Sequence, residues 1–244
     1  MSASFFKKNC WRLIIWPLWV LAGFFVAQLL TVGSLQLLNI SALESLDKTV
    51  FSTAVSVIIY VLTLVIVIGI PWWLKHIKTT RQDLGILRLP SWSDIGLAPV
   101  GFIVYIIIAA LLLWLATTFL LGINLDQVQE TGFGAISRRH EYLLAFSTLV
   151  VLAPLAEEIL FRGYLCSKLR KFAPAWVTIL VTSLVFGVIH GQWNVGLDTF
   201  ALSLVLCTLR EITGSIWSGV LLHMLKNGIA FYFLFINPML LNTL

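Results

Sequence analysis

Two adjacent carboxylates and one arginine interrupt a long apolar stretch of this chain. They are Glu157, Glu158 and Arg162. Ionisable side chains inside an apolar, helix-like stretch are costly to bury, so they usually serve a function. Glu158 and Arg162 are four residues apart, so they would share one helix face and could pair. Glu157 is rotated by about 100° from Glu158, so it could face a cavity instead.

Two later segments carry side chains that could work with a carboxylate. The first contains Phe186 and His190, and the second contains His223 and Asn227. The spacing within each pair is four residues, which places both side chains on one helix face. We therefore expect three helices to direct a carboxylate, two imidazoles and an amide at one polar pocket.

A helical hairpin would bring Glu157 and His190 to the same depth. If the chain turns at residues 171–174, Glu157 lies 14 residues before the turn and His190 lies 16 residues after it. At about 1.5 Å per residue, both side chains are roughly 21–24 Å from the turn. They would then lie at one level on neighbouring antiparallel helices.

The chemistry that these side chains favour is hydrolysis by an activated water. Glu157 could act as the general base, while His190 positions or deprotonates the water or later protonates the leaving amine. His223 and Asn227 could donate hydrogen bonds to a tetrahedral oxyanion, each worth about 3 kcal/mol. No serine or cysteine is evidently paired with these histidines as a nucleophile.

A zinc site is the alternative that the spacing leaves open. Glu157, His190 and His223 could form a site with two histidines and one carboxylate, in which the metal activates the water. A second zinc signature is excluded, because His140 and Glu141 begin an HExxH pattern but Leu144 replaces its second histidine.

Each feature alone has a simpler explanation. Glu158 and Arg162 could form a purely structural ion pair, because intramembrane charges often pair. A lone His190 could be an interfacial histidine, and a lone Asn227 could only join helices by hydrogen bonds. Phe186 is expected to pack beside His190. Only the joint occurrence of the motifs favours a functional site.

Several other residues are interpreted as having no part in the chemistry. The charges predicted to lie in solvated loops are those of Asp198, Arg210 and Glu211. The cysteines fit no disulfide or zinc pattern and are expected to be unreactive packing residues: Cys10, Cys166 and Cys207.

The elements that must position these residues are membrane-spanning helices. The chain has 244 residues, of which 59% are hydrophobic and 11% are charged, whereas soluble domains carry about 25% charged residues. Apolar runs of about 20 residues predict an all-α, polytopic helical membrane protein. We expect seven spans, or eight if a long helix is broken, in one bundle. The predicted spans are residues 11–38, 49–70, 95–121, 141–171, 174–190, 197–209 and 215–236.

The loops and domains follow from these spans. Polar connections are expected at residues 39–48, 75–94 and 122–139. We divide the single integral membrane domain into N-terminal helices and loops (1–140) and a catalytic core (141–244). Pro154 is expected to kink the fourth span.

The distribution of basic residues predicts the orientation. Lys7, Lys8 and Arg12 precede the first span, and further basic residues between Lys75 and Arg88 follow the second. Under the positive-inside rule the N-terminus is cytoplasmic, in a multi-pass protein of the cell (plasma) membrane. The net charge is +5, but the basic residues flank the spans and form no separate basic face, so no nucleic acid partner is expected.

The motifs, in this order, resemble those of the CAAX protease and bacteriocin-processing family of intramembrane proteases. They are EExxxR (Glu157, Glu158, Arg162), FxxxH (Phe186, His190) and HxxxN (His223, Asn227). The segments Phe161–Gly163 and Thr213–Trp217 resemble the bacterial branch of that family. The resemblance covers about residues 141–236.

The resemblance implies a helical core with a cavity open toward the cytoplasm. Glu157 and His190 would activate the water, and His223 and Asn227 would lie near the oxyanion. Glu158 and Arg162 would hold the site together. The family has been described both as metalloproteases and as metal-free glutamate enzymes. We favour the metal-free form, while zinc held by Glu157, His190 and His223 stays the alternative.

The implied partners are the lipid bilayer and a membrane-associated peptide or protein substrate. Bacterial relatives are linked to bacteriocin maturation, immunity and peptide signalling, and we do not expect prenylated CAAX proteins as substrates. One competing hypothesis is a non-catalytic bacteriocin immunity protein or scaffold with the same fold. Another is a small transporter with Glu157 and His190 as a proton relay. Inverted repeats would favour this hypothesis, but the sequence contains none.

Overall fold

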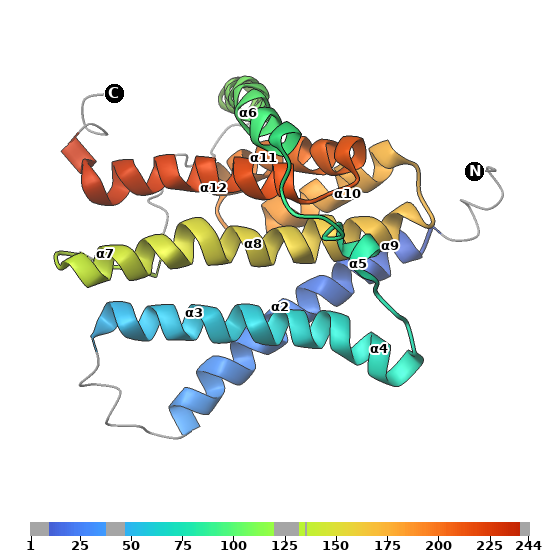
Figure 1. Ribbon diagram of the computed structural model, residues 1–244, viewed down its shortest axis with the longest axis horizontal. Helices are drawn as coiled ribbons and strands as arrows, with labels where there is room; N and C mark the ends of the chain where they lie inside the picture. The colour runs from blue at the N-terminus through green and yellow to red at the C-terminus, as the bar shows by residue number, and fades with distance from the viewer. Residues whose placement is uncertain (1–9, 38–46, 120–131, 135, 240–244) are drawn as a thin grey trace. The chain divides into compact units, whose positions relative to one another are not determined.

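The described parts of the chain are helical, as Figure 1 shows for this computed structural model. The structure describes residues 10–37, 47–119, 132–134 and 136–239. Among these residues there is no strand, so the all-α prediction is confirmed. The basic N-terminus before residue 10 and most of the predicted loops at 39–48 and 122–139 lie outside the described residues.

The helices follow one another with short connections. Segments marked η have π-helical hydrogen bonding and continue neighbouring α-helices. In chain order the elements are α2 (Arg12–Leu37), α3 (Lys48–Leu64), η2 (Val65–Gly69), α4 (Ile70–Lys75), α5 (Arg81–Leu84), α6 (Trp92–Phe119), α7 (Arg139–Phe146), η3 (Ser147–Leu152), α8 (Ala153–Glu158), η4 (Ile159–Leu165), α9 (Cys166–Arg170), α10 (Ala175–Val188), α11 (Trp193–Thr213), α12 (Trp217–Phe231) and η5 (Tyr232–Ile236).

Five helices in the described part of the chain are long and apolar enough to cross a membrane. They are Arg12–Leu37, Lys48–Lys75, Trp92–Phe119, Arg139–Arg170 and Trp217–Ile236. The other two predicted spans are also helices, α10 and α11. However, α10 has 14 residues, fewer than the about 20 that a span needs. The multi-pass prediction is therefore confirmed, and five of the predicted spans qualify as candidate membrane spans by length and composition.

The helices group into two compact units, which we describe separately. The first unit comprises residues 1–21, 79–129 and 157–223, and the second comprises 22–78, 130–156 and 224–244. The motif residues from Glu157 to His223 therefore belong to the first unit, whereas Asn227 belongs to the second. The predicted functional division at residue 140 stays a prediction.

The first unit has its apolar core between α6, α11 and α12. The buried residues of this core are Ala98, Tyr105, Ala201, Leu202, Val205, Leu206, Leu209 and Leu222. Gly101 allows α6 to approach closely, because a Cβ atom there would lie 2.5 Å from Leu222 Cδ1. Helix α10 packs against α11 through Gly187, where a Cβ atom would lie 2.8 Å from the carbonyl oxygen of Gly196.

The second unit packs α3 against α7 and η3. Its buried cluster contains Ala145, Val150 and Phe231. The rings of Phe146 and Phe231 meet edge to face with their centroids 5.5 Å apart. This unit thereby holds the first half of the helix that leads into the carboxylate motif.

That helix, Arg139–Arg170, changes its hydrogen-bonding register twice. The π-helical segments η3 and η4 flank the six residues of α8. Pro154 has no N–H group to donate to the carbonyl of Val150, and η3 ends two residues before it. The sequence predicted a kink at Pro154, and the structure places a π-helical segment immediately before α8. Such segments are frequent at functional sites.

Candidate active site

The carboxylate motif forms a fully buried ion pair. Arg162 Nη1 lies 2.9 Å from Glu158 Oε1, and both side chains are 0% exposed. The pair that the four-residue spacing predicts is therefore present. The Arg162 guanidinium also lies over the Phe186 ring, 4.4 Å from its centroid. Glu158 is thus neutralised inside the helix bundle of the first unit, where an unpaired charge would be costly.

A glycine on α12 makes room for the Glu158 carboxylate. A Cβ atom at Gly219 would lie 2.9 Å from Glu158 Oε2, closer than carbon and oxygen atoms pack. Gly219 is itself buried. The close approach of α12 brings its His223 to the same carboxylate.

His223 lies between the two glutamates. Its Nδ1 atom is 3.1 Å from Glu158 Oε1, and its Nε2 atom is 3.8 Å from Glu157 Oε2. Because the Glu158 carboxylate accepts from Arg162, Nδ1 carries the hydrogen and donates to Glu158. The buried ion pair therefore fixes the orientation of the imidazole, and Nε2 is the atom directed toward Glu157.

Glu157 is the more accessible of the two carboxylates. Its side chain is 19% exposed, whereas that of Glu158 is 0% exposed. The difference agrees with the rotation of about 100° between successive helical residues. One carboxylate is thus enclosed in the interior, whereas its neighbour keeps part of its side chain exposed.

Phe186 touches both imidazoles of the motifs. Its ring centroid lies 5.0 Å from that of His190 and 5.9 Å from that of His223, with edge-to-face geometry in both cases. Phe186 is 0% exposed. The sequence predicted that Phe186 packs beside His190. The structure adds two contacts, because the same ring also touches His223 and the Arg162 guanidinium.

The tautomer of His190 is set by the backbone of its own helix end. Its Nδ1 atom lies 2.7 Å from the carbonyl oxygen of Phe186. A carbonyl oxygen only accepts, so Nδ1 carries the hydrogen and Nε2 of a neutral imidazole is the acceptor. Helix α10 ends at Val188, and Gly191 adopts a φ of 70° at the following turn. His190 is partly exposed at this turn.

Asn227 belongs to the second unit. It lies one turn after His223 on α12, and its Nδ2 atom donates to the carbonyl oxygen of Leu149 at 2.9 Å. This bond joins α12 to η3, which is the helix-joining role considered above. An amide nitrogen has two hydrogens, so this bond is compatible with a second donor role.

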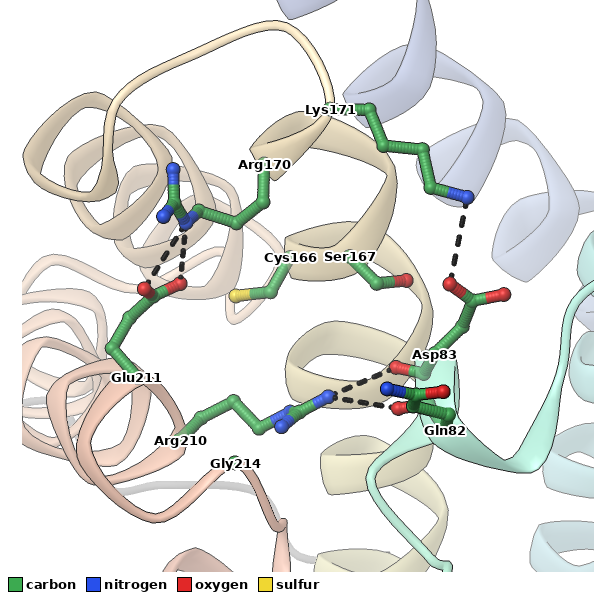
Figure 2. A pocket seen from close by; sticks show the side chains of 9 residues that line it. All are labelled: Gln82, Asp83, Cys166, Ser167, Arg170, Lys171, Arg210, Glu211 and Gly214. Carbon is green, nitrogen blue, oxygen red and sulfur yellow. Dashed lines mark hydrogen bonds and ion pairs between the residues drawn. The ribbon is translucent and has the colours of Figure 1, made fainter.

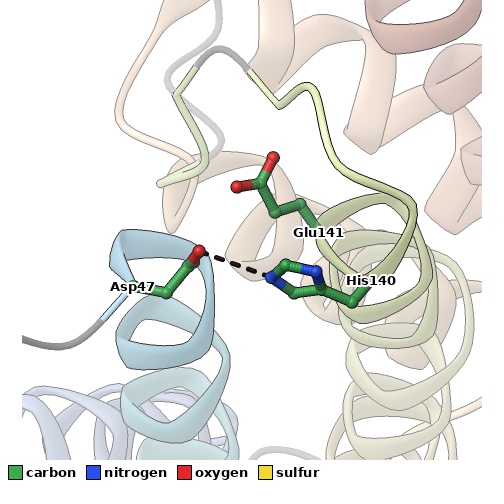
Figure 3. Close-up of side chains that lie close together, drawn as sticks. All are labelled: Asp47, His140 and Glu141. Carbon is green, nitrogen blue, oxygen red and sulfur yellow. Dashed lines mark hydrogen bonds and ion pairs between the residues drawn. The ribbon is translucent and has the colours of Figure 1, made fainter.

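A separate acidic cluster in the second unit has the residue types of a metal site (Figure 3). Among the described residues, the group whose ligand atoms all lie within 4.8 Å of one another is Asp47, His140 and Glu141. His140 Nε2 is 3.4 Å from Asp47 Oδ2. Glu157, His190 and His223 do not form such a group among the described residues, although His223 Nε2 lies 3.8 Å from Glu157 Oε2. A zinc site held by these three residues stays a prediction.

Helix capping explains the acidic cluster of Figure 3 without a metal. Glu141 Oε2 accepts the backbone N–H groups of Ser137 and Arg138 at 2.7 and 2.8 Å. Asp47 caps α3 by accepting the N–H of Thr49 at 2.8 Å. Burial raises the pKa of Asp47, but backbone hydrogen bonds and His140 outweigh it and hold the pKa below its usual value.

Three charges that the sequence placed in solvated loops have partners instead. Asp198 lies on α11 and accepts a hydrogen bond from the hydroxyl of Tyr105. Arg210 donates to the carbonyl of Arg162 at 3.3 Å, and Glu211 pairs with a nearby arginine. The loop interpretation was wrong, because helix α11 (Trp193–Thr213) contains all three residues.

Two cysteines from distant parts of the sequence are neighbours. Cys166 and Cys207 are buried, and their sulfur atoms lie 3.7 Å apart. They are free cysteines, as the absence of a disulfide pattern predicted. Their separation of 41 residues carries no signal of this contact, which depends on the packing of α9 against α11.

Comparisons with known proteins found one protein family and one curated relative that match part of the chain. Residues 139–229 match the protein family described as type II CAAX prenyl endopeptidase Rce1-like. A protein from Escherichia coli, described as an uncharacterized 24.3 kDa protein, is 35% identical over 89 residues, which cover 34% of this chain and 41% of that relative. The chain therefore spans about two fifths of the length of this curated relative. No solved structure matches the chain.

Proposed function

We propose that the protein is an intramembrane endopeptidase, because residues 139–229 match the family described as type II CAAX prenyl endopeptidase Rce1-like. Its substrate is a membrane-associated peptide or protein, and the reaction is hydrolysis of a peptide bond by an activated water. The protein resides in the cell membrane with a cytoplasmic N-terminus. The observation that carries the proposal is the accessible Glu157 carboxylate beside an imidazole that a buried ion pair orients.

In the proposed mechanism Glu157 is the general base. Its carboxylate takes a proton from a water molecule, and the resulting hydroxide oxygen attacks the carbonyl carbon of the scissile bond. His190 supports this step. Its Nδ1–H is held by the Phe186 carbonyl, so its Nε2 atom can accept a hydrogen bond from the water. The proton then passes to the nitrogen of the leaving amine as the C–N bond breaks.

The oxyanion of the tetrahedral intermediate needs hydrogen-bond donors. His223 is suited to this role when Nε2 carries a proton, because its Nδ1 is held by Glu158. The second hydrogen of the Asn227 amide is the other proposed donor. Donors of this kind are typically worth about 3 kcal/mol of transition-state stabilisation. Glu158 and Arg162 act as positioning residues.

The proposal is tested with purified protein in liposomes and a pool of quenched membrane peptides. Wild type, Glu157→Ala and His190→Ala are compared with and without a zinc chelator. We expect cleavage by wild type in both conditions, loss of cleavage in Glu157→Ala, and unchanged expression and folding of both variants. Loss of wild-type cleavage with the chelator, and its return with zinc, would establish the metal-dependent alternative.

The same variant separates the enzyme from a non-catalytic membrane protein. An immunity partner or scaffold would keep its partner-dependent phenotype in Glu157→Ala cells, because no water needs to be activated. Survival of such a phenotype together with the absence of cleavage in every sample would overturn the proposed activity.

A further inference from the structure

A polar pocket of about 360 Å³ lies in the first unit (Figure 2). It is formed by α5, by the end of α9 and by the end of α11. None of the motif residues lines it, so the proposed peptidase mechanism does not explain it. Figure 2 shows that charged side chains from all three elements surround this pocket.

The pocket carries more positive than negative charge. Its cations are Arg170, Lys171 and Arg210, and its carboxylates are Asp83 and Glu211. Arg170 Nε lies 2.8 Å from Glu211 Oε1, and Lys171 Nζ lies 3.4 Å from Asp83 Oδ1. Three cations against two carboxylates leave a formal excess of one positive charge.

Arg210 is the third cation of the pocket and takes part in neither of these two ion pairs. Its guanidinium donates to the backbone carbonyls of Gln82 at 3.3 Å and Asp83 at 3.1 Å. Carbonyl oxygens satisfy the hydrogens of a guanidinium but do not cancel its charge. Helix α5 thus holds this arginine in place at the pocket, with its charge available to an anion.

The other two cations are accessible. The side chains of Arg170 and Lys171 are 39% and 50% exposed. Ion pairs with this exposure are weak, because water and salt screen them. A stronger anion can therefore share these cations without breaking a buried interaction.

The pocket lies at the ends of candidate membrane spans. The α5 segment connects the span that ends at Lys75 with the one that begins at Trp92, and α9 is the end of the Arg139–Arg170 span. Basic pockets between membrane helices at this level favour phospholipid phosphates. We propose that this pocket binds the phosphate of an anionic phospholipid headgroup.

Lipid binding to the purified full chain tests this site by native mass spectrometry. The probes are phosphatidylglycerol, phosphatidylcholine of the same acyl chains, and inorganic phosphate as competitor. We expect preferential retention of phosphatidylglycerol and its loss only at high phosphate concentration. Equal retention of both lipids would overturn the proposal. Binding of inorganic phosphate as tightly as phosphatidylglycerol would also overturn it, by identifying free phosphate as the ligand.

Two variants that break the same ion pair give the decisive comparison. Arg170→Gln removes a cation, so we expect phosphatidylglycerol affinity to fall about fivefold. Glu211→Gln removes a carboxylate, so affinity should rise by a similar factor. A merely structural pair would instead lower affinity in both variants, and that result would refute the site.

The matched control is Arg81→Gln. Arg81 is exposed on α5 but does not line the pocket, so its loss should leave affinity unchanged. A fall equal to that of Arg170→Gln would show that the surface, rather than the pocket, attracts the lipid. Because lipid retention does not require peptide cleavage, the result is independent of the proposed peptidase activity.

Discussion

Two adjacent glutamates of the candidate site have the same chemistry but different surroundings. Glu158 is fully buried, paired with Arg162 and bonded to His223. Glu157 keeps part of its side chain exposed, and its Oε2 atom lies 3.8 Å from the other nitrogen, Nε2, of the same imidazole. We infer a division of roles, in which one carboxylate builds the site and the other reacts.

The structural role of the buried pair predicts a large loss of stability in Arg162→Gln. The change leaves the Glu158 carboxylate buried without its cation, which typically costs about 3–5 kcal/mol. We expect a decrease of this size in the free energy of unfolding, measured by denaturation in mixed micelles. The double variant Glu158→Gln/Arg162→Met should recover part of the loss because no charge stays buried.

The control for this experiment is the exposed Arg81→Gln, which should change the free energy of unfolding by less than about 0.5 kcal/mol. If Arg162→Gln were as stable as this control, the ion pair would not support the site.

At the residue scale the sequence predicted local pairs and missed distant ones. The spacing of Glu158 and Arg162 was sufficient to predict their ion pair, because residues four positions apart on a helix share a face. The bond between Tyr105 and Asp198 joins residues 93 apart, and no local spacing encodes it. The same applies to Arg210, whose carbonyl partners Gln82, Asp83 and Arg162 lie far from it in the sequence.

At the element scale the site depends on how closely α12 approaches α8. The apolar runs predicted that both elements are helices, but the π-helical segments η3 and η4 have no comparable signal in composition. They depend on packing and on the missing N–H group of Pro154. Gly219 is the contact that permits the approach, since Glu158 Oε2 occupies the space of its absent Cβ.

Gly219→Ala tests this contact. The added methyl group would displace the Glu158 carboxylate from His223, and overpacking of this kind typically costs about 1–3 kcal/mol. We expect a matching fall in the free energy of unfolding. The comparison is Gly96→Ala on α6, where no atom lies within 4 Å of the new Cβ. This control should be neutral or gain up to about 1 kcal/mol, so equal losses in both variants would contradict the proposed contact.

At the scale of the whole molecule the chain is a multi-pass helical membrane protein. Its outer helical faces expose large apolar side chains, for example Leu29 at 72% and Ile107 at 63%, as lipid contact requires. Hydropathy made this class predictable, because about 20 apolar residues in a row have few alternatives to a span. The grouping into two units was not predictable, since the boundaries fall inside helices at residues 156 and 223.

The orientation of the whole chain in the membrane is also predicted. Residues 76–91 are rich in lysine and arginine, so they should be cytoplasmic, and α6 should carry the chain to the opposite side. A phosphatase that works only outside the cytoplasm should be inactive when fused after Thr79 and active when fused after Gly132. The reverse pattern would invert the proposed topology and place the pocket of Figure 2 at the outer surface.

Activation of the water by Glu157 is tested most directly by the isosteric variant Glu157→Gln. Its shape is retained and its basicity is lost, so peptide cleavage in liposomes should fall by at least about 10²-fold. The free energy of unfolding should stay within about 0.5 kcal/mol of wild type. Cleavage at the wild-type rate by a correctly folded Glu157→Gln protein would contradict the mechanism.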